Sequence, residues 1–269
     1  MSVAELNGAR IAYEVHGSGP AVTLIHEGIA DRRMWQKTVP VLEPHFTVVT
    51  YDQRGYGDSS LPSGPATYVD DLRALLDHLG LDRTTLVGAS LGGRVALELA
   101  VLQPERFDRL ALVAAGLPGW DWSDEVKRFG EQEEEAYESG DLDRAVEVNL
   151  KLWVDGPRRG PDAVDPTMRA FVGEMQRRAF EIPVPDPEPT SEPPLDPPAR
   201  ERLGEIAIPT LVVIGDEDVE DIQKIAALLA EGIPGAQQVR LPDTAHMIPL
   251  ERPEEFNRIL LDFLHTDSR

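Results

Sequence analysis

A serine placed between two glycines is the first feature of this sequence that could do chemistry. The stretch Leu86 to Gly93 reads LVGASLGG, so Ser90 is the serine of a Gly-x-Ser-x-Gly pattern. An apolar run precedes it and a helical pattern follows it, as in a nucleophile elbow, where a sharp strand-to-helix turn lifts the serine hydroxyl above a sheet. Side chains at Gly88 or Gly92 would collide with neighbouring backbone in such a turn. Ser90 is therefore the candidate nucleophile.

A serine hydroxyl becomes a good nucleophile when a base removes its proton, and that base needs an anionic group to hold its tautomer. Both partners lie downstream of Ser90. The buried-strand pattern LVVIG runs into the acids Asp216, Glu217 and Asp218, and His246 follows the last expected strand. The carboxyl ends of parallel strands meet at one edge of a sheet, so these residues can converge. His246 is the candidate base, and both Asp216 and Asp218 are candidates for the acid.

The elements that must carry these residues alternate between strand and helix. Period-2 and apolar runs predict strands at residues 10–15, 21–25, 46–51, 84–87, 110–114, 210–214 and 237–241. Helical spacing predicts helices at residues 68–79, 91–102, 219–230 and 253–264. Such alternation is typical of an α/β fold, here a doubly wound, mostly parallel sheet covered on both faces.

A long segment of different character interrupts this alternation. It contains helical patterns at residues 125–137 and 142–154, and a third from Asp165, a plausible N-cap followed by Pro166, to residue 180. Proline recurs from residue 183 to 198, which favours an extended connector. We therefore expect a core from residues 1–118 and 201–269, with residues 119–200 inserted as a helical cap and its connector.

Composition limits the partners of this chain. The 26 basic and 48 acidic side chains leave a net charge of −22, which would repel phosphate backbones and anionic membranes. The sequence has no cysteine, no apolar run long enough to span a membrane, and no leader-like N-terminus. We expect a cytoplasmic protein that acts on a small molecule and binds neither nucleic acid nor membrane.

With these motifs in order, the chain resembles the α/β-hydrolase superfamily over nearly its whole length outside the cap. The resemblance implies Ser90 as nucleophile, His246 as base and Asp218 as the triad acid, in preference to Asp216. It also matches residues 52–59, DQRGYGDS, to a structural turn of such enzymes.

The resemblance also places an oxyanion hole. Its donors would be the backbone N–H groups of Leu91 and Gly28, aimed at the charge that develops on a carbonyl oxygen. Relatives usually carry glycine directly after the histidine that matches His26, whereas this chain has Glu27. A carboxylate aimed at the oxyanion would oppose catalysis, so we predict that Glu27 points away from the pocket. For His26 we predict a structural role, in which it ties down the loop by hydrogen bonds.

A serine at the elbow favours acyl transfer over the dehalogenase and epoxide hydrolase branches, which use aspartate there. Residues 26–35 look similar to enol-lactonase-like and small esterase members, so the expected substrate is a small carboxylic ester or lactone. Trp120, Trp122 and Trp153 of the cap would line an apolar pocket over the serine. No metal or nucleotide motif is complete, so no metal and no cofactor is expected.

Three other functions remain open at this point. A carbon–carbon bond hydrolase or a proline iminopeptidase would use the same triad, and a ligand receptor could retain the scaffold without catalysis. Relatives of the first kind have a glycine-rich loop where this chain reads Glu27 to Ala30, and those of the second tend to have tryptophan where Leu91 stands.

Overall fold

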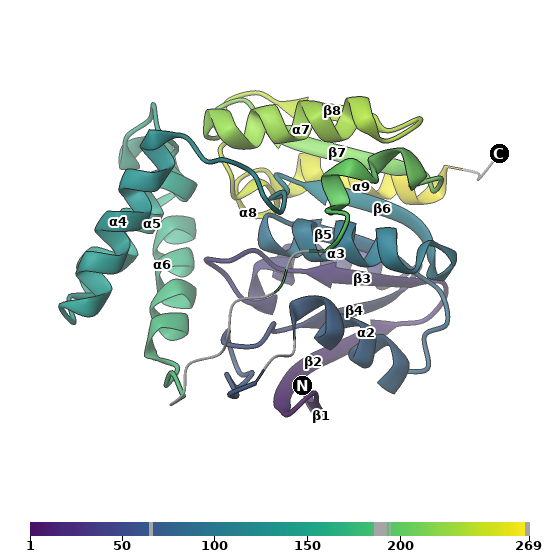
Figure 1. Cartoon of the computed structure of the whole chain (residues 1–269). Helices are drawn as coiled ribbons and strands as arrows, with labels where there is room; N and C mark the ends of the chain where they lie inside the picture. The colour runs from purple at the N-terminus through teal and green to yellow at the C-terminus, as the bar shows by residue number, and fades with distance from the viewer. Residues whose placement is uncertain (65–66, 186–192, 194, 267–269) are drawn as a thin grey trace.

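An eight-stranded sheet is the framework that carries the predicted site residues (Figure 1). The computed structural model describes residues 1–64, 67–185, 193 and 195–266. The strand order is β1-β2-β4-β3-β5-β6-β7-β8. The strands are β1 (Ser2–Leu6), β2 (Ala9–Gly17), β3 (Ala21–Ile25), β4 (Thr47–Tyr51), β5 (Thr84–Ala89), β6 (Phe107–Val113), β7 (Thr210–Gly215) and β8 (Gln237–Leu241). Neighbours from β4 to β8 pair in parallel, while β1 with β2 and β2 with β4 pair antiparallel. The predicted mostly parallel sheet is confirmed.

The strands that end at the site are the most deeply buried ones. Every residue of β5, TTLVGA, and of β7, TLVVIG, is buried. Continuous apolar runs of this kind are typical of parallel strands covered on both faces. Because β5 lies between β3 and β6, Ser90 emerges near the middle of the sheet rather than at its edge.

The sequence-based prediction missed the first strand. β1 forms a hairpin with β2 through Asn7 and Gly8, whose φ angles are 48° and 79°. Two successive positive φ values are typical of a type I′ turn, and Asn-Gly is its preferred sequence. The dipeptide was thus a readable hairpin signal.

Helices pack around this sheet. They are α1 (Val39–Leu42), α2 (Tyr68–His78), α3 (Leu91–Leu102), α4 (Asp124–Glu138), α5 (Leu142–Asn149), α6 (Pro166–Glu181), α7 (Glu220–Gly232), α8 (Ile248–Glu251) and α9 (Pro253–His265). The described residues also form short 3₁₀ and π helices: η1 (Arg32–Lys37), η2 (Pro104–Arg106), η3 (Leu150–Asp155), η4 (Pro161–Ala163), η5 (Ala199–Glu201) and η6 (Leu203–Glu205). α3 packs on β5 and β6, and α7 on β7 and β8. Among the described helices, none combines the length and apolar character that crossing a bilayer requires.

Between β6 and β7 the chain leaves the sheet and forms the cap helices, by which we mean α4, α5, η3 and α6. Figure 1 shows α4, α5 and α6 standing together at the left, beside the sheet. The predicted helices are confirmed, but the second continues from α5 into a π-helix, η3. Asp165 caps α6 as predicted, because its side chain accepts the Met168 N–H at 2.8 Å. Most of the predicted extended connector at residues 183–198 falls outside the described residues.

Candidate active site

Ser90 occupies a sharp turn between β5 and α3. Its φ of 48° and ψ of −111° lie in a region that residues other than glycine rarely adopt. The Ser90 N–H donates to the Val113 carbonyl at 2.9 Å, and the Ser90 carbonyl accepts from the N–H groups of Arg94 and Gly116 at 3.0 Å each. Hydrogen bonds from the sheet and from α3 therefore hold the strained turn in place.

The flanking glycines are required by close backbone contacts. A Cβ on Gly88 would lie 2.2 Å from the Gly92 carbonyl oxygen, and a Cβ on Gly92 would lie 2.4 Å from the Ile25 carbonyl oxygen. Both distances are far below van der Waals contact, so a side chain at either position would force the backbone apart. The steric reason predicted for these glycines is confirmed, and α3 is thereby pressed against the end of β3.

Asp218 and His246 form a buried pair beside this turn. The His246 Nδ1 lies 2.8 Å from Asp218 Oδ2, and the two residues are only 3 % and 1 % exposed. The other oxygen, Asp218 Oδ1, accepts the Val219 N–H at 2.7 Å. An ionised carboxylate only accepts hydrogen bonds, so Nδ1 of His246 must donate. In the neutral ring this leaves Nε2 unprotonated and able to act as a base.

A close approach of two loops brings this pair together. A Cβ on Gly215, at the end of β7, would lie 2.2 Å from the Thr244 carbonyl oxygen. The same carbonyl accepts the Glu217 N–H at 2.9 Å. The loops that carry Asp218 and His246 are therefore held together by backbone contacts that tolerate no side chain at Gly215.

Asp216, the competing acid, has a different partner. Its Oδ1 accepts from Arg240 of β8 at 2.7 Å, and both side chains are substantially exposed. Asp218 is therefore the carboxylate that faces His246, and Asp216 belongs to a surface ion pair.

Opposing effects act on the pKa of His246. Burial lowers the pKa of His246, while the negative charges of Asp218 and then Glu27 raise it, and the net result is a pKa above the ordinary value. An imidazolium at this position is thus stabilised by the carboxylates around it.

A cavity of about 200 Å³ joins Ser90 to His246. Core loops and cap helices both contribute to its wall, which is formed by Glu27, Gly28, Ile29, Ser90, Glu133, Asn149, Trp153, Gln176 and His246. The Trp153 ring lies 4.7 Å from the His246 ring, centre to centre. The cap helices therefore close over the serine and leave room for a small ligand.

The two residues predicted to supply the oxyanion hole lie side by side, and Gly28 lines this cavity. A Cβ on Gly28 would be 3.8 Å from the Leu91 Cβ. Leu91 is the first residue of α3, where backbone N–H groups have no acceptor within the helix. This placement fits two donors aimed at one oxygen, and their role stays a prediction.

His26 anchors the loop that carries Gly28. The Gln53 N–H donates to His26 Nε2 at 2.9 Å, so the proton of the neutral ring is on Nδ1, which donates to the Glu27 carbonyl at 2.7 Å. The Gln53 side chain also donates to the His26 carbonyl at 2.8 Å. Burial lowers the pKa of His26, which favours this neutral form. The predicted structural role is confirmed.

The prediction for Glu27 is wrong. Its side chain is 1 % exposed and lines the cavity, with Oε2 3.7 Å from His246 Nε2. Neither carboxylate oxygen has a hydrogen-bond partner among the described residues. The Glu27 carbonyl accepts from His26 Nδ1 and from the Ala30 N–H, and with the backbone held in this way the side chain lies on the cavity side. Burial raises the pKa of Glu27 to about 7; the charge of His246 lowers the pKa by less than burial raises it, and Asp218 raises it by a smaller amount still.

Of the three cap tryptophans predicted to line the pocket, one lies at the cavity and two lie elsewhere. Trp153 lines the cavity, whereas Trp120 and Trp122 do not. The Trp120 indole N–H donates to Asp221 of α7 at 3.0 Å, and Ser123 binds the same carboxylate. Trp120 therefore fastens the start of the cap to the core, and the predicted contact of Trp120 and Trp122 with substrate has no support in this geometry.

The sequence-based analysis missed the polar cap residues of the cavity. Glu133 of α4, Asn149 of α5 and Gln176 of α6 all line it. Glu133 sits four residues after the half-buried Phe129 and three before the buried Ala136, so helical spacing places it on the inner face of α4. Burial raises the pKa of Glu133, and a hydrogen bond from Asn149 lowers it by less. The acidic run of α4 thus contains one carboxylate that faces the cavity, next to carboxylates that face solvent.

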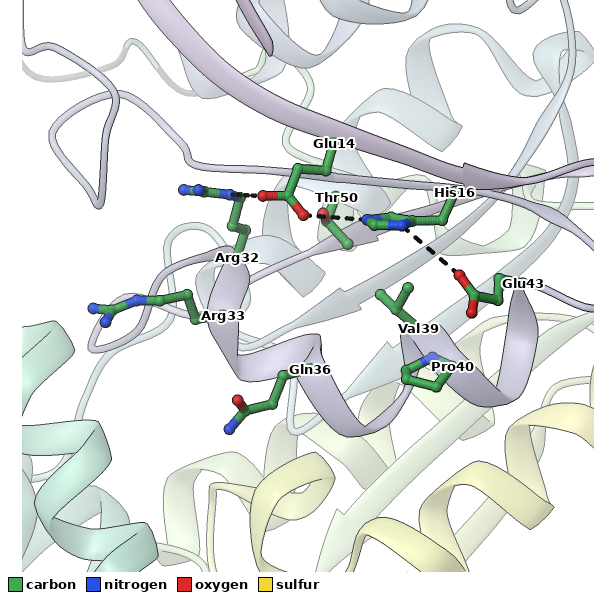
Figure 2. Close-up of a pocket in the computed structure, with 9 residues that line it drawn as sticks. All are labelled: Glu14, His16, Arg32, Arg33, Gln36, Val39, Pro40, Glu43 and Thr50. Atoms are coloured by element: carbon green, nitrogen blue, oxygen red, sulfur yellow. Dashed lines mark hydrogen bonds and ion pairs between the residues drawn. The ribbon is translucent and has the colours of Figure 1, made fainter. Parts of the chain in front are cut away.

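Two arginines near the loop lie outside the cavity. Arg32 and Arg33 line a larger groove of about 430 Å³. Figure 2 shows Arg32 bound to Glu14 in this groove. Arg32 also binds Asp52, and Arg33 binds Asp31 at 2.8 Å. Each positive charge is therefore balanced by carboxylates, and neither arginine reaches the cavity wall. Over the described ranges, no group of three or more His, Asp or Glu side chains is arranged to hold a metal ion.

Comparisons with known proteins agree with this geometry. A putative carbamate hydrolase, RutD, of Azorhizobium caulinodans is 27 % identical over 98 % of both chains. The crystal structure of an enol-lactonase from Burkholderia xenovorans superposes with a TM-score of 0.79 at 25 % identity, covering 98 % of this chain and 99 % of that one. A structure described as an N-acyl homoserine lactone degrading enzyme, Est816, has a TM-score of 0.75 at 27 % identity, with 97 % and 100 % covered. The model of the alpha/beta hydrolase family matches residues 15–259. The chain therefore belongs to the alpha/beta hydrolase family.

Proposed function

We propose that this chain is a serine hydrolase that cleaves a small carboxylic ester or lactone. Ser90 is the nucleophile, His246 the general base and acid, and Asp218 the acid that orients the imidazole. The N–H groups of Gly28 and Leu91 stabilise the oxyanion. Residues 119–200 form the cap that selects substrate, and residues 1–118 and 201–269 form the core that performs the chemistry.

The reaction runs in two halves. His246 Nε2 takes the Ser90 proton as the hydroxyl oxygen attacks the carbonyl carbon, and the tetrahedral intermediate collapses to an acyl-enzyme. The imidazolium gives its proton to the departing alkoxide, which for a lactone is the other end of the opened ring. A water molecule then loses a proton to His246 and attacks the acyl carbon, which releases the acid and restores Ser90.

One observation carries this proposal. The 2.8 Å hydrogen bond between His246 and Asp218 lies in the same buried site as a serine held in the strained elbow conformation. A base whose tautomer is set by a buried carboxylate has a free nitrogen at the cavity that Ser90 also lines. The relatives described as lactonases and as a carbamate hydrolase support acyl transfer as the reaction type.

The test is a substrate panel on the wild type and Ser90→Ala in parallel. The panel contains p-nitrophenyl esters of short acids, simple lactones, aminoacyl anilides and a ring-cleavage product with a hydrolysable carbon–carbon bond. We expect the wild type to hydrolyse esters or lactones, and Ser90→Ala to lose roughly 10⁴- to 10⁶-fold in kcat because it lacks the nucleophile. Circular dichroism and thermal melting check that the variant is folded.

The panel also separates the alternatives. Near-normal ester hydrolysis by Ser90→Ala would refute the assignment of the nucleophile. Turnover of aminoacyl anilides alone would indicate an aminopeptidase, and turnover of carbon–carbon bond substrates alone would indicate a hydrolase of that type. If the wild type turns over nothing and is not labelled by a fluorophosphonate, the scaffold serves as a receptor rather than as an enzyme.

A further inference from the structure

The cavity wall contains buried acceptor atoms without donors. Both carboxylate oxygens of Glu27 and the amide oxygen of Gln176 have no hydrogen-bond partner within the described part of the chain, although the two residues are only 1 % and 4 % exposed. A buried acceptor without a donor loses its hydration and gains nothing in return. Three such atoms at one cavity indicate that a ligand supplies the missing donors.

The charge around these atoms has one sign. Two carboxyl groups, from Glu27 and Glu133, line the cavity, and no lysine or arginine is among its lining residues. The arginines closest in sequence to the loop, Arg32 and Arg33, are held by other carboxylates. The net charge of −22 on the whole chain adds a long-range attraction for cations and repulsion for anions. The cavity is therefore suited to a positively charged donor.

Trp153 adds a second feature that favours a cation. Its indole lines the cavity, and its ring centre lies 4.7 Å from that of His246. Tryptophan is the side chain whose ring face attracts organic cations most strongly. Carboxylates combined with an indole suit an alkylated ammonium group. The carboxylates supply the negative charge and the hydrogen-bond acceptors, and the indole covers the alkyl surface.

The position of Glu27 indicates which part of a substrate would meet this site. Its Oε2 lies 3.7 Å from His246 Nε2. In the proposed reaction, Nε2 is the atom that passes its proton to the leaving oxygen. A group bound by Glu27 is therefore a close neighbour of the leaving oxygen, only a few bonds away from it.

We propose that the cavity binds an ammonium group on the leaving alcohol, so that the preferred substrates are small esters of amino alcohols. Glu27 accepts the ammonium N–H, Glu133 and Gln176 complete its surroundings, and Trp153 covers its alkyl groups. This inference rests on the serine hydrolase function proposed above. Hydrolysis consumes the ester and water and releases the carboxylic acid and the amino alcohol, whose oxygen takes the proton from His246. A cavity of about 200 Å³ limits both halves of the substrate to a few carbon atoms, since drug-sized ligands need about 300 Å³ or more.

A matched pair of esters tests the charge alone. Dimethylaminoethyl acetate and isopentyl acetate have nearly the same shape, but the first carries a protonated tertiary amine at neutral pH. Because a hydrogen bond to a charged group is the stronger kind, we expect the wild type to favour the amino ester by roughly 10- to 100-fold in kcat/KM. Acetoxybutyrate, an anionic ester, should be the poorest of the three. Acetate release, followed in a pH-stat, measures all of them.

Three variants locate the effect. Glu27→Gln should reduce the preference between the two esters to less than about threefold, and Glu133→Gln should reduce it in part. Glu134→Gln is the matched control, because it removes the same charge from the next position of α4, where the side chain is exposed and does not line the cavity. It should keep the wild-type preference. Each variant is judged by the ratio of the two esters, so a general loss of activity does not imitate the result.

Binding provides a readout that does not depend on turnover. Calorimetric titration of Ser90→Ala with dimethylaminoethanol and with isopentyl alcohol should show at least tenfold tighter binding of the amino alcohol, and Glu27→Gln in that background should abolish the difference. Equal binding of the two alcohols would overturn the ammonium site. Ser90-dependent hydrolysis of both esters without preference would do the same and leave the serine hydrolase function standing. Tight binding of the amino alcohol without hydrolysis of any ester would retain the ammonium site and refute the hydrolase function.

Discussion

Replacing Glu27 by glutamine should move the pH dependence of catalysis in a direction that the geometry dictates. His246 must be neutral at Nε2 to take the Ser90 proton, so activity is lost as pH falls through the pKa of His246. After burial, which lowers that pKa, Asp218 and Glu27 are the groups that raise it. Removing the Glu27 charge therefore lowers the His246 pKa and shifts the acidic limb of the kcat/KM profile to lower pH.

The size of this shift follows from the distance between the two groups. At the 3.7 Å that separates Glu27 Oε2 from His246 Nε2, two full charges interact by about 1 kcal/mol in water and about 4.5 kcal/mol at an effective dielectric constant of about 20. Glu27, with a pKa of about 7, is only partly ionised near neutral pH. The lower part of this range applies, so we expect a shift of about one pH unit.

The assay is hydrolysis of a neutral p-nitrophenyl ester by the wild type, Glu27→Gln and the control Glu134→Gln across the pH range from acid to mildly alkaline. The neutral ester keeps substrate charge out of the comparison, and the control removes one exposed carboxylate of the same chain. An acidic limb that stays in place in Glu27→Gln, or that moves to higher pH, would refute the electrostatic coupling between Glu27 and His246. An equal shift in both variants would attribute the effect to net charge instead.

Three further outcomes can be measured on the same protein. Asp218→Asn should lower kcat by roughly 10³- to 10⁴-fold, because the imidazole loses its orienting anion. Asp216→Asn breaks only the exposed ion pair with Arg240 and should change kcat by less than about threefold. Comparable losses of kcat in both variants would contradict the choice of Asp218. Glu27→Gln should also stabilise the fold at alkaline pH. Burial raises the pKa of Glu27 in the folded protein to about 7, above the ordinary 4.5. The wild type therefore loses stability as the pH rises from 4.5 through about 7, by up to roughly 3 kcal/mol, and the glutamine variant does not. Urea denaturation at acidic and alkaline pH measures this, and a stability difference that does not grow with pH would argue against it. Trp153→Leu should raise KM and lower kcat together, since the indole both lines the cavity and packs on His246, and an unchanged kcat/KM in steady-state assays would count against that dual contact.

A stabilising Glu27→Gln would have a plain meaning for the site. Burying a carboxyl group that has no hydrogen-bond partner costs folding free energy, and proteins retain such groups where activity needs them. In the proposed reaction the same residue faces the leaving-group side of His246, so this result would mean that Glu27 lowers stability at a position where it determines specificity.

Much of the architecture could be read from local patterns. The strand and helix positions follow from periodicities of the chain itself, which need no knowledge of distant contacts. The elbow at Ser90 follows from two glycines spaced to let a strand meet a helix, and the structure shows the backbone contacts that require them. β1 escaped prediction although Asn7-Gly8 marked its hairpin, because its short strand has little apolar character.

Distant contacts decided the rest. Local sequence does not distinguish Asp216 from Asp218. Their roles differ because Arg240 of β8 binds Asp216, while His246 binds Asp218. The loop of Glu27 is anchored through His26 by Gln53, which lies 27 positions further along the chain. A periodic pattern says which face of a segment is turned inward, but the partner met by that face comes from elsewhere in the chain. The candidate site residues could therefore be identified from the sequence alone. Their electrostatic environment could not, because it arises from packing between segments that are far apart in the sequence.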